Sequence, residues 1–217
     1  MASKGKKLQR SVNCRPPIYR ILIVSEGKKT EPNYFNEIRK YYRLSTATVK
    51  VLPSDMGTNP INIVDYARKI FCEGDNKRGL DAQVYDEVYT VFDRDEHPYY
   101  KDAIEKMESL SGKYKNDLKQ KVPFYAIPSN PCFELWILLH YKNIFNLQHR
   151  HDIFAQVKEF ITNYDKGMVG VFSVTQTYLA EAKSRAKSIN AKGTPLSEDF
   201  PYTAVVNLVE KLEALRK

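Results

Sequence analysis

Residues 18–26 have the sequence IYRILIVSE, and residues 88–95 have the sequence VYTVFDRD. Each stretch contains a short apolar run that predicts a buried β-strand, and each run ends in acidic residues. Helical patterns follow both runs, so the two strands are expected to be parallel, with their carboxyl ends at one edge of a sheet. The sequence therefore predicts that Glu26, Asp93 and Asp95 converge at that edge.

The alternation of strands and helices continues on both sides of these runs. Residues 47–52 (ATVKVL) predict a second strand, and residues 122–127 (VPFYAI) predict a fourth. The intervening and following helices are expected to begin at Thr30 and Asn59, as N-caps, and to cover residues 99–118 and 133–141. This order predicts an α/β fold with a mostly parallel four-stranded sheet flanked by helices.

The rest of the chain suggests two further regions. Residues 1–16 carry several lysines and arginines and no acidic residue, which predicts a flexible basic tail. The α/β domain would then cover residues 17–145. Residues 146–217 show only helical patterns, at about 151–163, 174–191 and 202–216, and are expected to form a C-terminal helical extension that packs on the domain or caps it.

Composition limits the classes of function. The chain has 217 residues and a formal net charge of +8, which favours a polyanionic partner such as DNA or RNA. Its apolar stretches are far too short to span a membrane, and no signal peptide is apparent, so we expect no membrane partner. Three widely spaced cysteines argue against a zinc site and, being few and odd in number, fit a reducing cytoplasm.

Clustered carboxylates at a sheet edge favour a divalent cation. Oxygen ligands suit Mg²⁺ or Mn²⁺, so Glu26, Asp93 and Asp95 are candidate metal ligands and candidate catalytic residues. Glu31 and Glu134 are candidates for additional ligands. The alternative is that Glu26 only caps the next helix or pairs with a lysine, and that the two aspartates belong to an ordinary Asp-rich turn.

Basic and polar residues near the same edge are candidates for substrate binding. Lys28, Lys29 and Arg94 follow the two strands and could contact phosphates. Asn130 either supports the metal or substrate, or caps the helix that contains Glu134. His97, which follows the Asp-x-Asp segment, could also reach the site, although an exposed loop position is the simpler expectation.

The arrangement strand–Glu-Gly–helix followed by strand–Asp-x-Asp resembles the Toprim fold of topoisomerases, bacterial primases and nucleases of the overcoming-lysogenization-defect type. Four segments, in order along nearly the whole chain, also look like the RloB family: VSEGKKTEPNYF, VFDRDEH, SNPCFELWILLHY and PYTAVVNLVEKL. The resemblance implies a Toprim-related protein in which the glutamate and the two aspartates bind the metal. It also implies a restriction-modification or phage-defence locus, with an AAA- or ABC-type ATPase as partner.

These observations together predict a Mg²⁺- or Mn²⁺-dependent nuclease that hydrolyses phosphodiester bonds. Two other functions are compatible with the same residues. One is a non-catalytic nucleic-acid- or phosphate-binding subunit of an ATPase-containing defence complex. The other is a Toprim-like enzyme that hydrolyses or transfers nucleotides. No P-loop motif occurs, so any ATPase activity would come from the partner.

Overall fold

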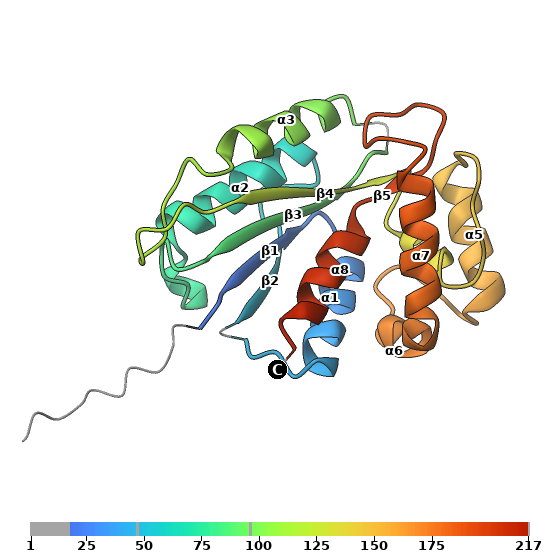
Figure 1. The fold of residues 1–217 in the computed structure, drawn as a ribbon, viewed down its shortest axis with the longest axis horizontal. Helices are drawn as coiled ribbons and strands as arrows, with labels where there is room; N and C mark the ends of the chain where they lie inside the picture. Colours follow the sequence, from blue (N-terminus) through green and yellow to red (C-terminus); the bar gives the residue numbers. More distant parts are fainter. Residues whose placement is uncertain (1–17, 47, 96, 217) are drawn as a thin grey trace, which may run out of the picture.

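A computed structural model describes residues 18–46, 48–95 and 97–216, and the predicted basic tail lies outside them. The fold is built on a five-stranded sheet with the strand order β2-β1-β3-β4-β5 (Figure 1). β1 pairs in parallel with β2 and β3, and β3 pairs in parallel with β4. The strands are β1 (Ile21–Ser25), β2 (Val49–Pro53), β3 (Glu87–Asp93), β4 (Phe124–Asn130) and β5 (Tyr202–Thr203).

The α/β class and the mostly parallel sheet are confirmed, and the architecture is consistent with a Toprim-like fold. The expected strand number was wrong, because β5 adds a fifth strand antiparallel to β4. β5 has only two residues and lies where the sequence predicted the start of a helix. A two-residue strand is too short to produce a periodic pattern, and it forms because it pairs with the end of β4.

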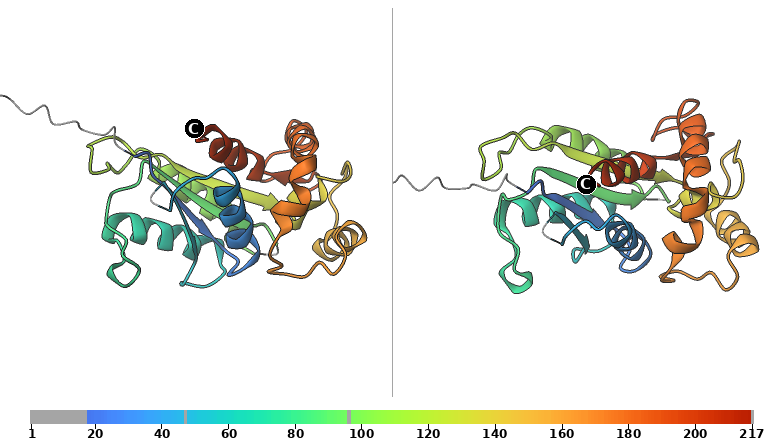
Figure 2. Two further views of the ribbon diagram at one scale, coloured as in Figure 1. Left: turned by 90° about the horizontal axis from the view of Figure 1, so that it is seen from below. Right: turned by 60° about the horizontal axis from the view of Figure 1, so that its bottom comes forward.

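Helices cover both faces of the sheet (Figures 1 and 2). Along β1, Ile21 and Ile23 contribute to a core shared with α1 and α8, whereas Leu22 and Val24 contribute to a core shared with α2 and α3. This alternation follows from the two-residue period of a strand. The helices are α1 (Thr30–Tyr41), α2 (Pro60–Glu73), α3 (Tyr100–Leu110), α4 (Glu134–Leu138), α5 (Arg150–Phe160), α6 (Val171–Thr175), α7 (Leu179–Asn190) and α8 (Val205–Ala214), with 3₁₀ turns η1 (Asn76–Arg78) and η2 (Gln176–Tyr178).

Several boundaries differ from the sequence expectation. β4 continues through Asn130, so this residue ends a strand and does not cap a helix. Thr30 was expected to be the N-cap of α1, but it is the first residue of the helix and Lys29 occupies the cap position without a side-chain hydrogen bond. The Thr30 hydroxyl accepts a hydrogen bond from the distant Gly167 N–H. The helix predicted at 174–191 is divided into α6, η2 and α7. In contrast, Asn59 caps α2 as predicted by accepting a hydrogen bond from the Ile61 N–H.

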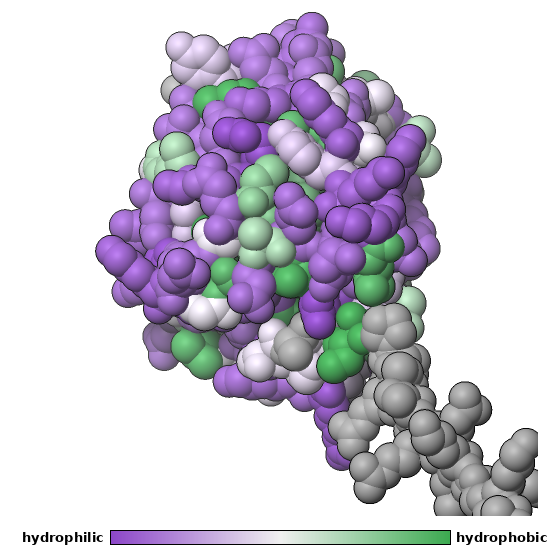
Figure 3. Space-filling view, turned by 90° about the vertical axis from the view of Figure 1, so that its left-hand side faces the viewer, coloured by the Kyte–Doolittle hydropathy of each residue, from purple (hydrophilic) through white to green (hydrophobic). Residues whose placement is uncertain are grey.

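The C-terminal residues contribute directly to the core. α8 packs on the sheet beside α1, and its Val205, Leu208 and Leu212 are fully buried. No helix within the described ranges is both long and apolar enough to cross a membrane. The left-hand side of the molecule in Figure 1, seen face-on in Figure 3, is mainly hydrophilic with scattered apolar residues.

Candidate metal centre

The centre is built where β1 and β3 end side by side. Glu26 directly follows the last residue of β1, and its N–H donates to the Val91 carbonyl on β3 at 2.9 Å. Its side chain continues toward the same strand, because Glu26 Oε2 accepts a hydrogen bond from the Asp93 N–H at 3.0 Å. The parallel pairing of the two strands therefore brings Glu26 to Asp93, as the sequence predicted.

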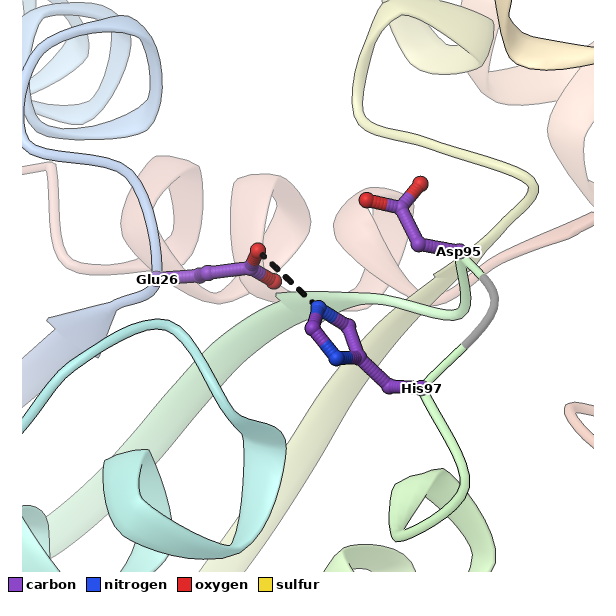
Figure 4. Close-up of side chains that lie close together, drawn as sticks. All are labelled: Glu26, Asp95 and His97. Atoms are coloured by element: carbon purple, nitrogen blue, oxygen red, sulfur yellow. Dashed lines mark ion pairs between the residues drawn. The ribbon is translucent and has the colours of Figure 1, made fainter.

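Three side chains present donor atoms to a common point just beyond these strands (Figure 4). One ligand atom from each of Glu26, Asp95 and His97 lies within 4.8 Å of the other two. His97 Nε2 is 3.9 Å from Glu26 Oε1. The chain turns sharply after β3, with Asp95 at a positive φ of 36°, and this turn brings Asp95 and His97 to the site. His97 is therefore partly buried beside Glu26, whereas an exposed loop position was the simpler expectation from the sequence.

Asp93 lies deeper than these three side chains and does not belong to the donor group. Its residue is only 8% exposed, and its Oδ1 is buried with no hydrogen-bond partner among the described residues. Burial raises the pKa of Asp93 well above its ordinary value, and the neighbouring carboxyl groups of Glu31, Glu26 and Glu134 raise it further. An ionised Asp93 therefore lacks the positive partner that a buried charge needs.

Glu31 and Glu134 are two further acidic residues close to Asp93. Both are buried, and each lies in the first turn of its helix, α1 or α4. Glu31 Oε1 accepts a hydrogen bond from the Gly27 N–H at 3.3 Å. A Cβ at Gly27 would lie 2.0 Å from Glu31 Oε2, so a larger residue here would force the Glu31 carboxyl group to move. Glu134 Oε1 is 3.5 Å from the Tyr164 hydroxyl.

Burial shifts the protonation of the cluster. Desolvation raises the pKa of Glu26 to about 7, although the hydrogen bond from the Asp93 N–H opposes the shift. Desolvation likewise raises the pKa of Glu31 to about 7, with Glu134 contributing in the same direction. The cluster thus retains protons near neutral pH unless a cation replaces them.

The candidate phosphate-binding residues have different surroundings. Lys28 and Lys29 are exposed and line the cleft that contains Glu26, Glu31, Asp93 and Glu134.

Arg94 and Asn130 form hydrogen bonds with the C-terminal segment. The Arg94 guanidinium donates to the Ser197 carbonyl. Asn130 Nδ2 donates to the carbonyls of Ser197 at 2.9 Å and Phe200 at 3.1 Å. The expectation that Asn130 caps a helix was therefore wrong, because its amide instead fixes the chain that precedes β5.

The structure adds Arg150, which sequence reasoning did not propose. Arg150 is the first residue of α5, and its guanidinium forms an ion pair with Asp95. Nothing in the local sequence, HRHD at a helix start, indicates a residue that reaches a site more than fifty positions away. Only the tertiary packing of α5 against α4 places it there.

The donor set suits a divalent cation. Carboxylates are preferred by Mg²⁺ and Mn²⁺, and an imidazole favours Mn²⁺ between these two ions. The buried Asp93 Oδ1 has no hydrogen-bond partner among the described residues, so a cation beside Glu26, Asp95 and His97 would supply the positive charge that this oxygen lacks. The residues present therefore fit the divalent cation that was expected from the sequence.

Comparison with known sequences gives one positive finding. The family model described as RloB-like protein matches residues 21–212, which is most of the chain, and confirms the resemblance seen in the sequence motifs. No curated protein matches the chain. No solved structure matches it either.

Proposed function

Since this chain belongs to the RloB-like family, we propose that it is a Mg²⁺- or Mn²⁺-dependent nuclease that hydrolyses phosphodiester bonds. The observation that carries the proposal is the convergence of Glu26, Asp95 and His97 within 4.8 Å beside the buried, unpartnered Asp93 carboxylate. An acidic cluster of this kind in a chain with a net charge of +8 is suited to a polyanionic substrate.

Each group would have a distinct role in this mechanism. Glu26, Asp95 and His97 would hold the cation. The buried Asp93 would add negative charge next to it, and Glu31 and Glu134 are candidates for further ligands. When bound, the cation would lower the pKa of water and neutralise charge on the phosphate. Lys28 and Lys29, at the rim of the same cleft, would attract the nucleic-acid backbone.

We further propose that the protein acts in antiphage defence or beside a restriction-modification system, together with an AAA- or ABC-type ATPase. The family resemblance supports this role, and the absence of a P-loop motif in the sequence agrees with an ATPase supplied by another chain. The experiment therefore includes an ATPase of this type.

The test is cleavage of labelled single- and double-stranded DNA and RNA with Mg²⁺, Mn²⁺ or EDTA, with and without that ATPase. Asp95→Asn and Glu26→Gln should each lower the metal-dependent rate by about 100-fold or more, the loss typical of removing a group that stabilises transition-state charge. Asp102→Asn, which alters an exposed carboxylate on α3, is the matched control and should cut normally.

The outcomes separate the alternatives. Undiminished cleavage by Asp95→Asn would contradict the proposed site. Metal-dependent binding without any product would favour the non-catalytic binding subunit. Conversion of free nucleotides in place of polymers, followed by mass spectrometry, would favour the nucleotide hydrolase or transferase.

A further inference from the structure

Arg150 lies at the boundary between two clefts. One cleft contains the buried acids Glu31, Asp93 and Glu134 and the partly buried Glu26. The other is a larger groove of about 1060 Å³ that runs along the N-terminal end of α5. Among the residues of the described part of the chain that line these clefts, Arg150 is the one that lines both. The groove is also lined by Asp95 and His97, so a strand of nucleic acid in it would lie beside Arg150 and beside two of the three clustered donors.

The ion pair with Asp95 places Arg150 in competition with a metal. Asp95 Oδ2 accepts the hydrogen bond from Arg150, while Asp95 Oδ1 is buried and has no partner among the described residues. Because Asp95 is one of the three clustered donors, a cation bound there would lie close to the guanidinium and repel it. An anion bound near Arg150 would offset this repulsion.

We propose that Arg150 binds the phosphate group to be cleaved, pairing with Asp95 in the metal-free protein and with a non-bridging phosphate oxygen when the cation is bound. This inference rests on the proposed function and names a substrate-binding residue for it. The planar guanidinium presents five N–H donors in a fork that matches a phosphate, so it can change partners without losing its hydrogen bonds.

The surroundings of the other cations favour Arg150 for this role. Arg94 is held by the Ser197 carbonyl. Lys28 and Lys29 are exposed at the rim of the acidic cleft and do not line the groove. The Arg150 side chain is 31% exposed, which leaves it accessible to a ligand, and the position at the start of an eleven-residue helix adds a favourable dipole for an anion.

The test compares Arg150→Gln, Arg150→Lys and Lys158→Gln with the unmodified protein. Lys158 is exposed on the same helix, so its replacement removes one positive charge without touching either cleft. Mn²⁺ affinity is measured by titration calorimetry without nucleic acid. Arg150→Gln should bind Mn²⁺ as tightly as the unmodified protein or several-fold tighter, because a competitor for Asp95 has been removed.

The second measurement is the affinity for a short fluorescent single-stranded DNA and its RNA equivalent, in Ca²⁺ to limit cleavage and in EDTA. Arg150→Gln should weaken binding about ten- to hundred-fold in Ca²⁺, as expected for loss of a hydrogen bond to a charged group, and have little effect in EDTA. Arg150→Lys should restore part of the affinity. Lys158→Gln should behave as the unmodified protein in both conditions.

Two results would overturn the inference. Weaker Mn²⁺ binding by Arg150→Gln would show that Arg150 only holds Asp95 in position. If Arg150→Gln and the unmodified protein bound the oligonucleotide with equal affinity in Ca²⁺, Arg150 would not contact the phosphate. Both measurements are independent of cleavage, so an unmodified protein that binds Mn²⁺ and the oligonucleotide but does not cut would refute the nuclease function while leaving Arg150 as the phosphate ligand.

Discussion

The Asp93 carboxyl group has the least favourable environment of the candidate ligands, because it is buried beside other acids and its Oδ1 has no partner among the described residues. In the unfolded chain such a group ionises near its ordinary pKa, whereas in the folded protein its pKa is raised well above that value. Glu26 and Glu31 behave similarly, with pKa values of about 7. The folded state therefore binds more protons than the unfolded state between about pH 4.5 and pH 7.

It follows that the metal-free protein should lose stability as the pH rises through this window. For each proton that the folded state binds and the unfolded state does not, the free energy of unfolding falls by about 1.4 kcal/mol per pH unit. Asp93→Asn removes one titrating carboxyl group and supplies donors to its acidic neighbours. In EDTA at pH 8, scanning calorimetry should show a free energy of unfolding higher by on the order of 1–3 kcal/mol, with a shallower pH dependence.

Asp81→Asn serves as the control, because Asp81 is exposed. Its pH profile should match that of the unmodified protein. Mn²⁺ should stabilise the unmodified protein more at pH 8 than at pH 5.5, since the cation competes with protons, and should stabilise Asp93→Asn less. Lower stability of Asp93→Asn at pH 8 would contradict the assignment of an uncompensated charge to Asp93.

The contrast between Glu26 and Arg150 shows what a sequence can predict about this site. Glu26 and Asp93 follow apolar runs, and the rule that parallel strands end at one edge brings them together. His97 enters through a positive-φ turn at Asp95, and Arg150 enters through the packing of a later helix. Neither the turn nor the helix packing produces a periodic pattern in the sequence, so the position of His97 or Arg150 at the site could not be predicted from residue spacing.

At the level of elements, the same lack of a local sequence signal explains why the predicted end of β4 was wrong. The sequence predicted that the strand ends at residue 127, yet β4 continues to Asn130 because Ser129 and Asn130 pair with Thr203 and Tyr202 on β5. Pro128 also takes part, since its carbonyl accepts a hydrogen bond from the Ala204 N–H at 2.9 Å. Strand length here is set by a partner distant in sequence, whereas α2 was predicted correctly from its own cap and apolar stripe.

The attachment of α1 to the loop before α6 allows an element-level prediction. Gly167 donates to the Thr30 hydroxyl, and its carbonyl accepts from Asn33, both at 3.0 Å. Its φ is +85°, and an added Cβ would lie 2.7 Å from Lys29 Cβ. Gly167→Ala should therefore combine left-handed strain with overpacking and destabilise the protein by on the order of 2–4 kcal/mol.

Gly170→Ala is the matched control, because Gly170 has a φ of +92° with nothing within 4 Å of an added Cβ. This change should cost only the backbone component, about 1–2 kcal/mol. The two variants are compared by urea denaturation in EDTA. Equal losses of stability would show that the loop shifts freely and does not hold the start of α1.

For the whole molecule, the packing argues for one folding unit. The sheet is shared by the two cores, and α8 from the end of the chain lies in the same core as β1 and α1. The sequence-based boundary between 145 and 146 separates residues that pack against one another through α8 and β4. Whether that boundary marks a separable domain stays a prediction, and it can be tested by the cooperativity of unfolding.

Leu208→Ala should shift the unfolding of the entire molecule. Leu208 is fully buried on α8, and its truncation should cost about 2–5 kcal/mol, which corresponds to roughly 2–4 °C per kcal/mol at this chain length. The sole tryptophan, Trp136, reports on the core that contains α8, whereas far-UV circular dichroism also reports on α2 and α3 across the sheet. Both probes should shift together, and Asn207→Ala, an exposed change on the same helix, should leave them unchanged. If only the tryptophan transition moved, the two faces would unfold separately and the single-unit interpretation would be wrong.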